Sequence, residues 1–383
     1  MILPDYRGNS IVNLVSSIMR ACGARSVYPT LRRLPPEELA GYRNIVLFVI
    51  DGLGYDYVLK HKDSVMAEHL KARMTAVFPP TTAASITSFM TGLAPQNHGM
   101  TGWFVQLKEL GMVTAVLPFK PQFGGLSLDN VDPVALKIFD QKSLFDKLKV
   151  KSYAIHDENI LYSGYSSSHL GRAKKVPYKN LNGFFKQLKK VVRIKGRKLV
   201  YAYWPQFDHL CHHHRKASGI VLRHFRELDK GVASFLKSMK GTNTVLIITA
   251  DHGLIDTARS RMIKVGDHPV LESALSLPLC GEPRTAYCYV HPSKSKLFLS
   301  YVKHKLNNVC DVYRSEDLIK RGLFGLFKPH KHFFDRIGDY VIIMKKNYTI
   351  RQKPLGKPIV YHAGVHGGIS PEEMFVPLIV VKG

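Results

Sequence analysis

Short continuous apolar runs recur along the chain, and each has about the length of a β-strand. The clearest cover residues 45–50, 152–156, 199–204, 245–249 and 375–381, and another at 74–78 breaks at two prolines. Runs without polar alternation are typical of strands that are buried on both faces of a parallel sheet. Two of them are followed at once or after one residue by an acidic residue, Asp51 and Asp251. A buried charge at such a position needs a partner or a function.

Helical periodicity separates these strands. Apolar residues at 11, 14, 15 and 18 predict a helix over about 10–22, which Asn9 or Ser10 caps and Gly23 ends. Further helices are predicted over about 81–91 and 220–239. Strands that alternate with helices predict an α/β fold, with a mostly parallel central sheet flanked by helices on both faces. The candidate catalytic residues should then lie along one edge of this sheet, where loops leave the strand ends.

The pattern changes between residues 266 and 358. Strands are predicted over 285–290 and 340–344, a helix over 294–307, and an irregular turn over 322–332. We interpret residues 266–358 as a small inserted cap subdomain. The remaining chain, residues 1–265 and 359–383, would then form the catalytic domain.

Composition is that of an ordinary globular protein, with 383 residues, 45% hydrophobic and 22% charged. The apolar runs are too short to span a bilayer, and the first residues lack a basic segment followed by an apolar stretch. We therefore expect a cytoplasmic protein. The five cysteines are an odd number without CxxC spacing, which argues against both a disulfide framework and a thiolate zinc site.

Charge is strongly positive and unevenly distributed. The net charge of +26 fits attraction of phosphorylated substrates, and equally of nucleic acid or an anionic membrane. Residues 171–198 hold eleven Lys or Arg and no acid. Helical spacing there places apolar residues on one face, with Lys186, Lys189, Lys190 and Arg193 on the other. This face is either simply solvated or a docking surface for a polyanion or membrane. No obligate protein partner is evident.

Seven oxygen and imidazole donors stand after apolar runs or in glycine-rich turns. They are Asp51, Thr82, Asp208, His212, Asp251, His252 and His366. Asp208 and His212 are four residues apart and would share a helix face. Imidazole and carboxylate without thiolate suit Zn, Mn or Fe, and two such ions about 4 Å apart are a common device for phosphoryl transfer. Thr82 is the natural nucleophile, at a helix N-terminus whose free N–H groups suit phosphate.

These residues occur in motifs that resemble the alkaline phosphatase superfamily, and in particular its type I phosphodiesterase/nucleotide pyrophosphatase branch. The motifs are 48–52 (FVIDG), 78–82 (FPPTT), 91–99 (TGLAPQNHG), Asp208 with His212, 249–253 (TADHG) and 365–368 (VHGG). The resemblance implies one divalent metal held by Asp51, Thr82, Asp251 and His252, and a second held by Asp208, His212 and His366. It also implies a phospho-threonine intermediate on Thr82, with Thr81 as the alternative nucleophile. Zinc is the expected metal, and manganese or iron would also suit these ligands.

Two departures from the family pattern concern the substrate. Ala83 stands where nucleotide pyrophosphatases often have an aromatic residue that holds the base, and residues 101–104 (TGWF) stand where they use an asparagine to hold a phosphate oxygen. Tyr55, Trp103 and Phe104 are candidates to line the substrate pocket. His209, His213, His214, Asp267, His268 and His362 lie near the motifs and are not assigned as ligands.

The sequence therefore predicts a two-metal hydrolase of phosphate esters, most simply a phosphodiesterase or nucleotide pyrophosphatase that acts on a small phosphorylated molecule. Two alternatives stay open. One is a phosphomonoesterase or phosphonate hydrolase of the same superfamily, including PglZ-like phosphatases. The other is a basic protein that binds nucleic acid or membrane and retains a decayed site.

Overall fold

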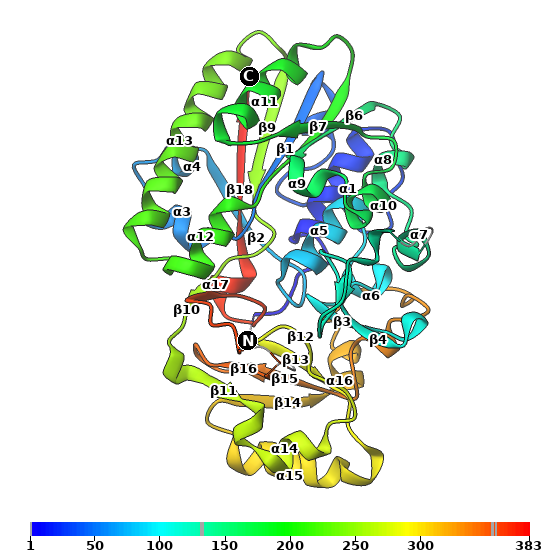
Figure 1. The fold of residues 1–383 in the computed structure, drawn as a ribbon. Helices are drawn as coiled ribbons and strands as arrows, with labels where there is room; N and C mark the ends of the chain where they lie inside the picture. The colour runs from blue at the N-terminus through cyan, green and yellow to red at the C-terminus, as the bar shows by residue number, and fades with distance from the viewer. Residues whose placement is uncertain (1, 131–133, 354–355, 357) are drawn as a thin grey trace.

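A seven-stranded sheet forms the centre of the computed structural model, which describes residues 2–130, 134–353, 356 and 358–383 (Figure 1). Its strand order is β2 (Leu70–Thr75), β18 (Phe375–Lys382), β9 (Thr244–Thr249), β1 (Asn44–Ile50), β8 (Lys198–Trp204), β6 (Lys151–Asp157) and β7 (Lys174–Tyr178). The five strands from β9 to β7 are parallel, and β18 is antiparallel to both of its neighbours. The predicted mostly parallel α/β sheet is confirmed.

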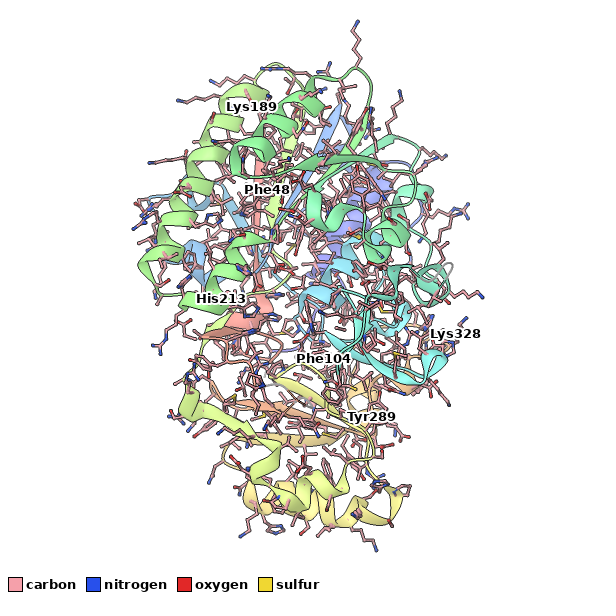
Figure 2. The ribbon with its side chains drawn as sticks, viewed as in Figure 1. Phe48, Phe104, Lys189, His213, Tyr289 and Lys328 are labelled. Carbon is pink, nitrogen blue, oxygen red and sulfur yellow. The ribbon has the colours of Figure 1, made fainter. Side chains whose placement is uncertain are left out.

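Helices cover both faces of this sheet, one layer on each side in Figure 1. One layer contains α1 (Ile11–Ala21), α5 (Thr82–Thr91) and α10 (Gly164–Leu170), and the other contains α11 (Leu181–Arg193), α12 (Gln206–His214) and α13 (Gly219–Met239). Their apolar faces close the core. Phe48 of β1, for example, contacts Phe184 of α11 with ring centroids 4.8 Å apart, and Figure 2 shows Phe48 in the interior.

A second sheet, entirely antiparallel, lies beyond one end of the first (Figure 1). Its order is β14 (Cys310–Arg314), β15 (Tyr340–Met344), β13 (Thr285–Cys288), β12 (Cys280–Gly281), β3 (Phe104–Leu107), β4 (Met112–Ala115) and β5 (Lys120–Pro121). Helices α14 (Pro269–Ala274) and α15 (Ser295–Lys305) enclose a separate apolar core with it. Strands β3 to β5 precede the predicted insertion 266–358, so this sheet combines two distant parts of the chain. Residues 354–355 and 357 of that segment lie outside the described residues.

One predicted strand is wrong in its position. The sequence predicted a strand over 74–78, whereas β2 ends at Thr75 and begins at Leu70. As an edge strand, β2 alternates between exposed residues such as Lys71 and Arg73 and more buried ones, so it carries no continuous apolar run. Residues 76–80 are buried but have no strand pairing, and they lead into α5.

Two short strand pairs connect the sheets near the predicted site. β10 (Ile255–Asp256) pairs with β17 (Gly364–Val365), and β11 (Met262–Lys264) pairs with β16 (Thr349–Arg351).

All five cysteines are buried and unbridged, as expected. No helix in the described part of the chain is long and apolar enough to cross a membrane.

Candidate metal centre

Adjacent parallel strands deliver Asp51 and Asp251 to the same edge of the central sheet. β1 pairs with β9 up to the partners Val49 and Thr249, and both strands end just before the carboxylates. The Gly52 and His252 backbone N–H groups both donate to Asp251 Oδ1, each at 3.0 Å. Gly52 has φ +74°, and a Cβ there would lie 2.6 Å from Leu254. The tight turn after β1 thus requires glycine.

His252 joins three of the predicted ligands into a first cluster. Its Nε2 lies 3.4 Å from Asp51 Oδ1, 3.4 Å from Asp251 Oδ2 and 3.1 Å from Thr82 Oγ1. All four side chains are buried. Asp51 Oδ1 and Asp251 Oδ2 accept no hydrogen bond from the described residues, and burying such oxygens is costly. A cation at this position would satisfy both.

Asp208, His212 and His366 lie beside this cluster. α12 presents Asp208 and His212 on one face, with His212 Nε2 3.1 Å from Asp208 Oδ2. The His366 ring stacks on that of His252 with centroids 3.8 Å apart and lies 5.2 Å from that of His212. Ligand atoms of Asp208, His252 and His366 come within 4.8 Å of one another. His252 therefore stands between the two predicted metal positions, and Asp208 Oδ1 is another buried oxygen without a hydrogen bond.

A backbone carbonyl oxygen orients each of the three imidazoles, those of His212, His252 and His366. Nδ1 of His212 donates to Gly364 O at 2.7 Å, that of His252 to Gly253 O at 3.1 Å, and that of His366 to Pro80 O at 3.2 Å. A carbonyl oxygen can only accept, so Nδ1 carries the proton and Nε2 is left as a lone-pair donor. Backbone carbonyls that fix the tautomer in this way are typical of histidine ligands to metals.

Electrostatics also favour a bound cation. Burial, together with the charges of Asp251 and Asp208, raises the pKa of Asp51 well above its usual value, and burial also raises the pKa of Asp251. Burial and the neighbouring His252 lower the pKa of His366. Asp208 is an exception, because its attraction to His212 outweighs burial and lowers its pKa. Without positive charge, the cluster therefore resists ionising the carboxylates that a metal would need.

The two adjacent threonines have different surroundings. Thr82, the first residue of α5, places its hydroxyl at the first cluster. The Thr81 hydroxyl instead donates to Glu282 Oε1 at 2.5 Å. The geometry therefore favours Thr82 over Thr81 as the attacking group.

Sequence reasoning missed two residues at the site. Glu282, in the turn between β12 and β13, is only 8% exposed and also accepts a hydrogen bond from the Trp103 N–H at 2.7 Å. Burial raises the pKa of Glu282 to about 7. The Tyr203 hydroxyl donates to Asp51 Oδ2. Neither residue belongs to a recognisable sequence motif. Glu282 reaches the site from the turn before β13 in the second sheet, and Tyr203 reaches it from β8 in the central sheet.

The three residues predicted to line the substrate pocket lie in different surroundings. Trp103 is half-buried and adjoins the site through Glu282, whereas Phe104 packs within the core of the second sheet. Tyr55 begins α3 (Tyr55–Lys60) and lines an open concavity with Leu59 and Lys62. Among the described residues it forms no hydrogen bond with the metal centre.

The fold and these two donor clusters fit a hydrolase of phosphate esters. The family model for type I phosphodiesterase/nucleotide pyrophosphatase matches residues 45–369, and the chain belongs to this family. Its members are divalent-metal enzymes that act on small phosphorylated substrates.

Solved structures agree with this fold. Murine and human ectonucleotide pyrophosphatase/phosphodiesterase 5 each superpose with a TM-score of 0.64 at 18% identity, covering 87% of both chains. An inactive threonine-to-alanine variant of the murine protein, in complex with AMP, superposes with a TM-score of 0.63. A comparison with curated protein sequences gave no match.

Proposed function

We propose that the protein hydrolyses a phosphodiester or pyrophosphate bond in a small molecule through a phospho-threonine intermediate on Thr82. The observation that carries this proposal is the placement of the Thr82 hydroxyl, 3.1 Å from His252 Nε2, beside buried carboxylate oxygens without hydrogen bonds. Asp51, Thr82, Asp251 and His252 would hold one divalent ion, and Asp208, His212 and His366 the other. Bound there, the ions, zinc in the first instance, would lower the pKa of the hydroxyl and neutralise phosphoryl charge.

In this reaction Thr82 Oγ1 forms a bond to phosphorus, and the bond from phosphorus to the bridging oxygen breaks. The hydroxyl proton is released to solvent, and the bridging oxygen keeps the electron pair, takes up a proton from water and departs on the side opposite Thr82. The N–H groups in the first turn of α5, which begins at Thr82, would stabilise the charge of the phosphoryl oxygens. Water then hydrolyses the phospho-threonine.

The murine relative supports the role of threonine, since its inactive form is a threonine-to-alanine variant. That variant was solved with AMP. For the present chain, Ala83 leaves recognition of a nucleotide base without the expected aromatic residue, so we propose a phosphodiesterase without specifying the base.

The test is hydrolysis of bis-p-nitrophenyl phosphate by metal-loaded Thr82→Ala and Thr81→Ala proteins. Thr82→Ala should lower kcat by about a thousandfold or more, because the nucleophile is lost. Thr81→Ala should retain most activity, and a phosphopeptide containing Thr82 should be trapped by acid quench. If Thr81→Ala loses activity and Thr82→Ala keeps it, the assignment is wrong.

The phosphomonoesterase alternative predicts a preference for p-nitrophenyl phosphate. The buried Glu282 favours the diester, because its carboxylate, hydrogen-bonded to Thr81 next to the nucleophile Thr82, repels a dianionic monoester more than a monoanionic diester. A preference for the monoester by orders of magnitude would contradict the diesterase proposal.

We also propose that the basic face of α11 binds a polyanion or an anionic membrane, since Lys186, Lys190 and Arg193 are exposed on it. Lys198, counted in the basic stretch, is not part of this face. It is buried and donates to Asn44 Oδ1 at 2.7 Å.

A further inference from the structure

Three imidazoles that are not assigned as ligands lie on the solvent side of the metal centre. Two of them, His209 and His213, are exposed on α12, and their ring centroids are 4.7 Å apart. Residues four apart share a helix face, which is also the spacing of paired histidine ligands on helices. Neither ring forms a hydrogen bond or ion pair with a described residue. In its neutral form, each ring therefore offers a lone pair to an external ligand.

His362 connects this pair with the buried centre. It comes from the segment before β17, and two hydrogen bonds hold this segment against α12. The Ala363 N–H donates to His212 O at 2.7 Å, and His212 Nδ1 donates to Gly364 O at 2.7 Å. The His362 ring centroid consequently lies 6.4 Å from that of His213 and 4.5 Å from that of His212.

The ring spacings suit an ion that moves from one imidazole to the next. Zinc binds imidazole at about 2.0–2.1 Å, so two rings that share one ion have their centres roughly 5–6 Å apart. Successive rings of the row lie 6.4, 4.5 and 5.2 Å apart, in the order His213, His362, His212 and His366. Exposure falls along the same row, from the exposed His213 through the half-buried His362 to His366, which is 7% exposed. The row thus leads from solvent to the metal centre.

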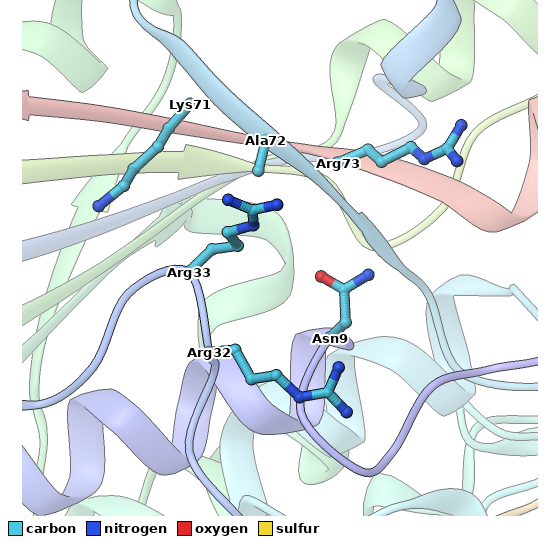
Figure 3. Close-up of a pocket in the computed structure, with 6 residues that line it drawn as sticks. All are labelled: Asn9, Arg32, Arg33, Lys71, Ala72 and Arg73. Atoms are coloured by element: carbon cyan, nitrogen blue, oxygen red, sulfur yellow. The ribbon is translucent and has the colours of Figure 1, made fainter.

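The strong positive charge of the protein opposes the capture of cations from solution. The net charge is +26. An open concavity beside β2 is lined by Asn9, Arg32, Arg33, Lys71, Ala72 and Arg73 (Figure 3). A concavity lined by one sign of charge attracts ions of the opposite sign and repels those of its own. Neutral nitrogen donors at the surface, as on α12, are the better place to capture a divalent ion.

We propose that His209 and His213 form an outer site that captures Zn²⁺ or a similar divalent transition metal ion, and that His362 passes this ion to the buried centre. Imidazole suits such ions, whereas Ca²⁺ and Mg²⁺ prefer oxygen ligands. Water completes the coordination, so the outer site binds more weakly than the centre and releases its ion. For the next imidazole, an ion held there has an effective concentration on the order of millimolar. The transfer step rests on the proposed function, whereas the outer site does not.

Zinc binding to metal-free protein tests the outer site. Equilibrium dialysis of wild type should show two tightly bound equivalents and a third, weaker one. The double variant His209→Gln, His213→Gln should lose the weaker equivalent and keep the tight ones. His291→Gln is the matched control, because His291 is exposed and has no ring contact with a described residue, and it should bind zinc as wild type does. A double variant that keeps the third equivalent at unchanged affinity would overturn the outer site.

The rate of zinc loading tests the transfer. At about 1 μM zinc, the centre should fill about tenfold more slowly in the double variant and in His362→Gln, because the ion is no longer held close to the centre. At about 1 mM zinc, all these proteins should fill at similar rates, since free zinc then matches that effective concentration. Elemental analysis after rapid removal of free and weakly bound zinc measures the filling. Loading rates equal to that of wild type at the lower concentration would overturn the transfer.

The outcomes separate this inference from the proposed function. If wild type binds only the weaker zinc ion, the proposed metal centre fails and the transfer fails with it, while the outer site stands. If wild type binds the tight equivalents without the weaker one, the inference is overturned and the proposed function stands.

Discussion

Glu282 shows how a single buried residue can make the stability of the protein depend on pH. Its pKa is about 7 instead of the ordinary 4.5, because burial disfavours the carboxylate. The folded state therefore loses stability as pH rises from about 4.5 to about 7, by up to about 3 kcal/mol. We expect metal-free Glu282→Gln to be more stable than wild type at pH 8 and similar at pH 4.5, as measured by urea unfolding.

Glu109→Gln is a control variant that should change the stability of the fold at pH 8 in the opposite direction. A hydrogen bond from its own backbone N–H, together with Arg336, outweighs burial and holds the pKa of Glu109 below its usual value. The carboxylate thus stabilises the fold at neutral pH and ceases to do so in acid, so this variant should be less stable than wild type at pH 8. Equal pH profiles for the two variants would contradict both assignments.

At the scale of elements, a buried ion pair connects the second sheet to the catalytic edge of the first. Arg284, before β13, donates to both carboxylate oxygens of Glu373 in α17 (Pro371–Met374), at 3.1 and 2.9 Å. Both side chains are essentially inaccessible. Glu373→Ala should lower the free energy of unfolding by about 3–5 kcal/mol, because it leaves an unpaired buried charge.

Asp311→Ala is the matched control for that pair. Asp311 pairs with Lys345 at 2.8 Å, but the two side chains are 48% and 38% exposed. Its removal should therefore cost less than about 1 kcal/mol. Chemical denaturation of the two variants side by side checks the difference, and similar losses would contradict a special role for the buried pair.

The basic face of α11 is also a property of a single structural element. Its apolar side, including Phe184 and Leu188, packs inward as predicted, and Lys189 lies on the outer side (Figure 2), where its Nζ contacts Ser234 Oγ at 2.9 Å. Replacing Lys186, Lys189 and Lys190 with Glu should weaken binding to RNA or anionic liposomes, most clearly at low salt. Binding that does not change would remove the docking proposal.

For the whole molecule, metal binding and folding should be coupled. The clusters bury carboxylate oxygens that lack hydrogen bonds and oppose one another's ionisation. We expect zinc to raise the free energy of unfolding by about 3 kcal/mol at a hundred times its Kd, and chelator to reverse this. Thermal unfolding with zinc titration measures the effect.

Asp251→Asn distinguishes a specific site from general salt effects. This variant removes one of the mutually repelling carboxylates, so it should be at least as stable as wild type without metal. It should also lose most of the zinc-induced rise. A rise equal to that of wild type would exclude Asp251 as a ligand.

Most strands of the central sheet could be predicted from sequence because they are buried on both faces and so carry continuous apolar runs. β7 was not predicted, since its residues are mostly exposed or half-buried. β2 could not be placed correctly, since an edge strand with exposed Lys71 and Arg73 lacks such a run. The predicted cap subdomain over 266–358 did not include β3 to β5, because β3 joins that sheet by pairing with β12, more than a hundred residues further along the chain. The cytoplasmic location stays a prediction.

By itself, the sequence determined the class of chemistry, because seven donors in ordered motifs are local signals at strand and helix ends. Only the tertiary structure decided which neighbours surround them. Thr81 is engaged by Glu282, and the three imidazoles are oriented by backbone carbonyls. Each of these depends on contacts between segments far apart in the chain. Such contacts follow from how the two sheets pack, and periodicity within one segment carries no information about them.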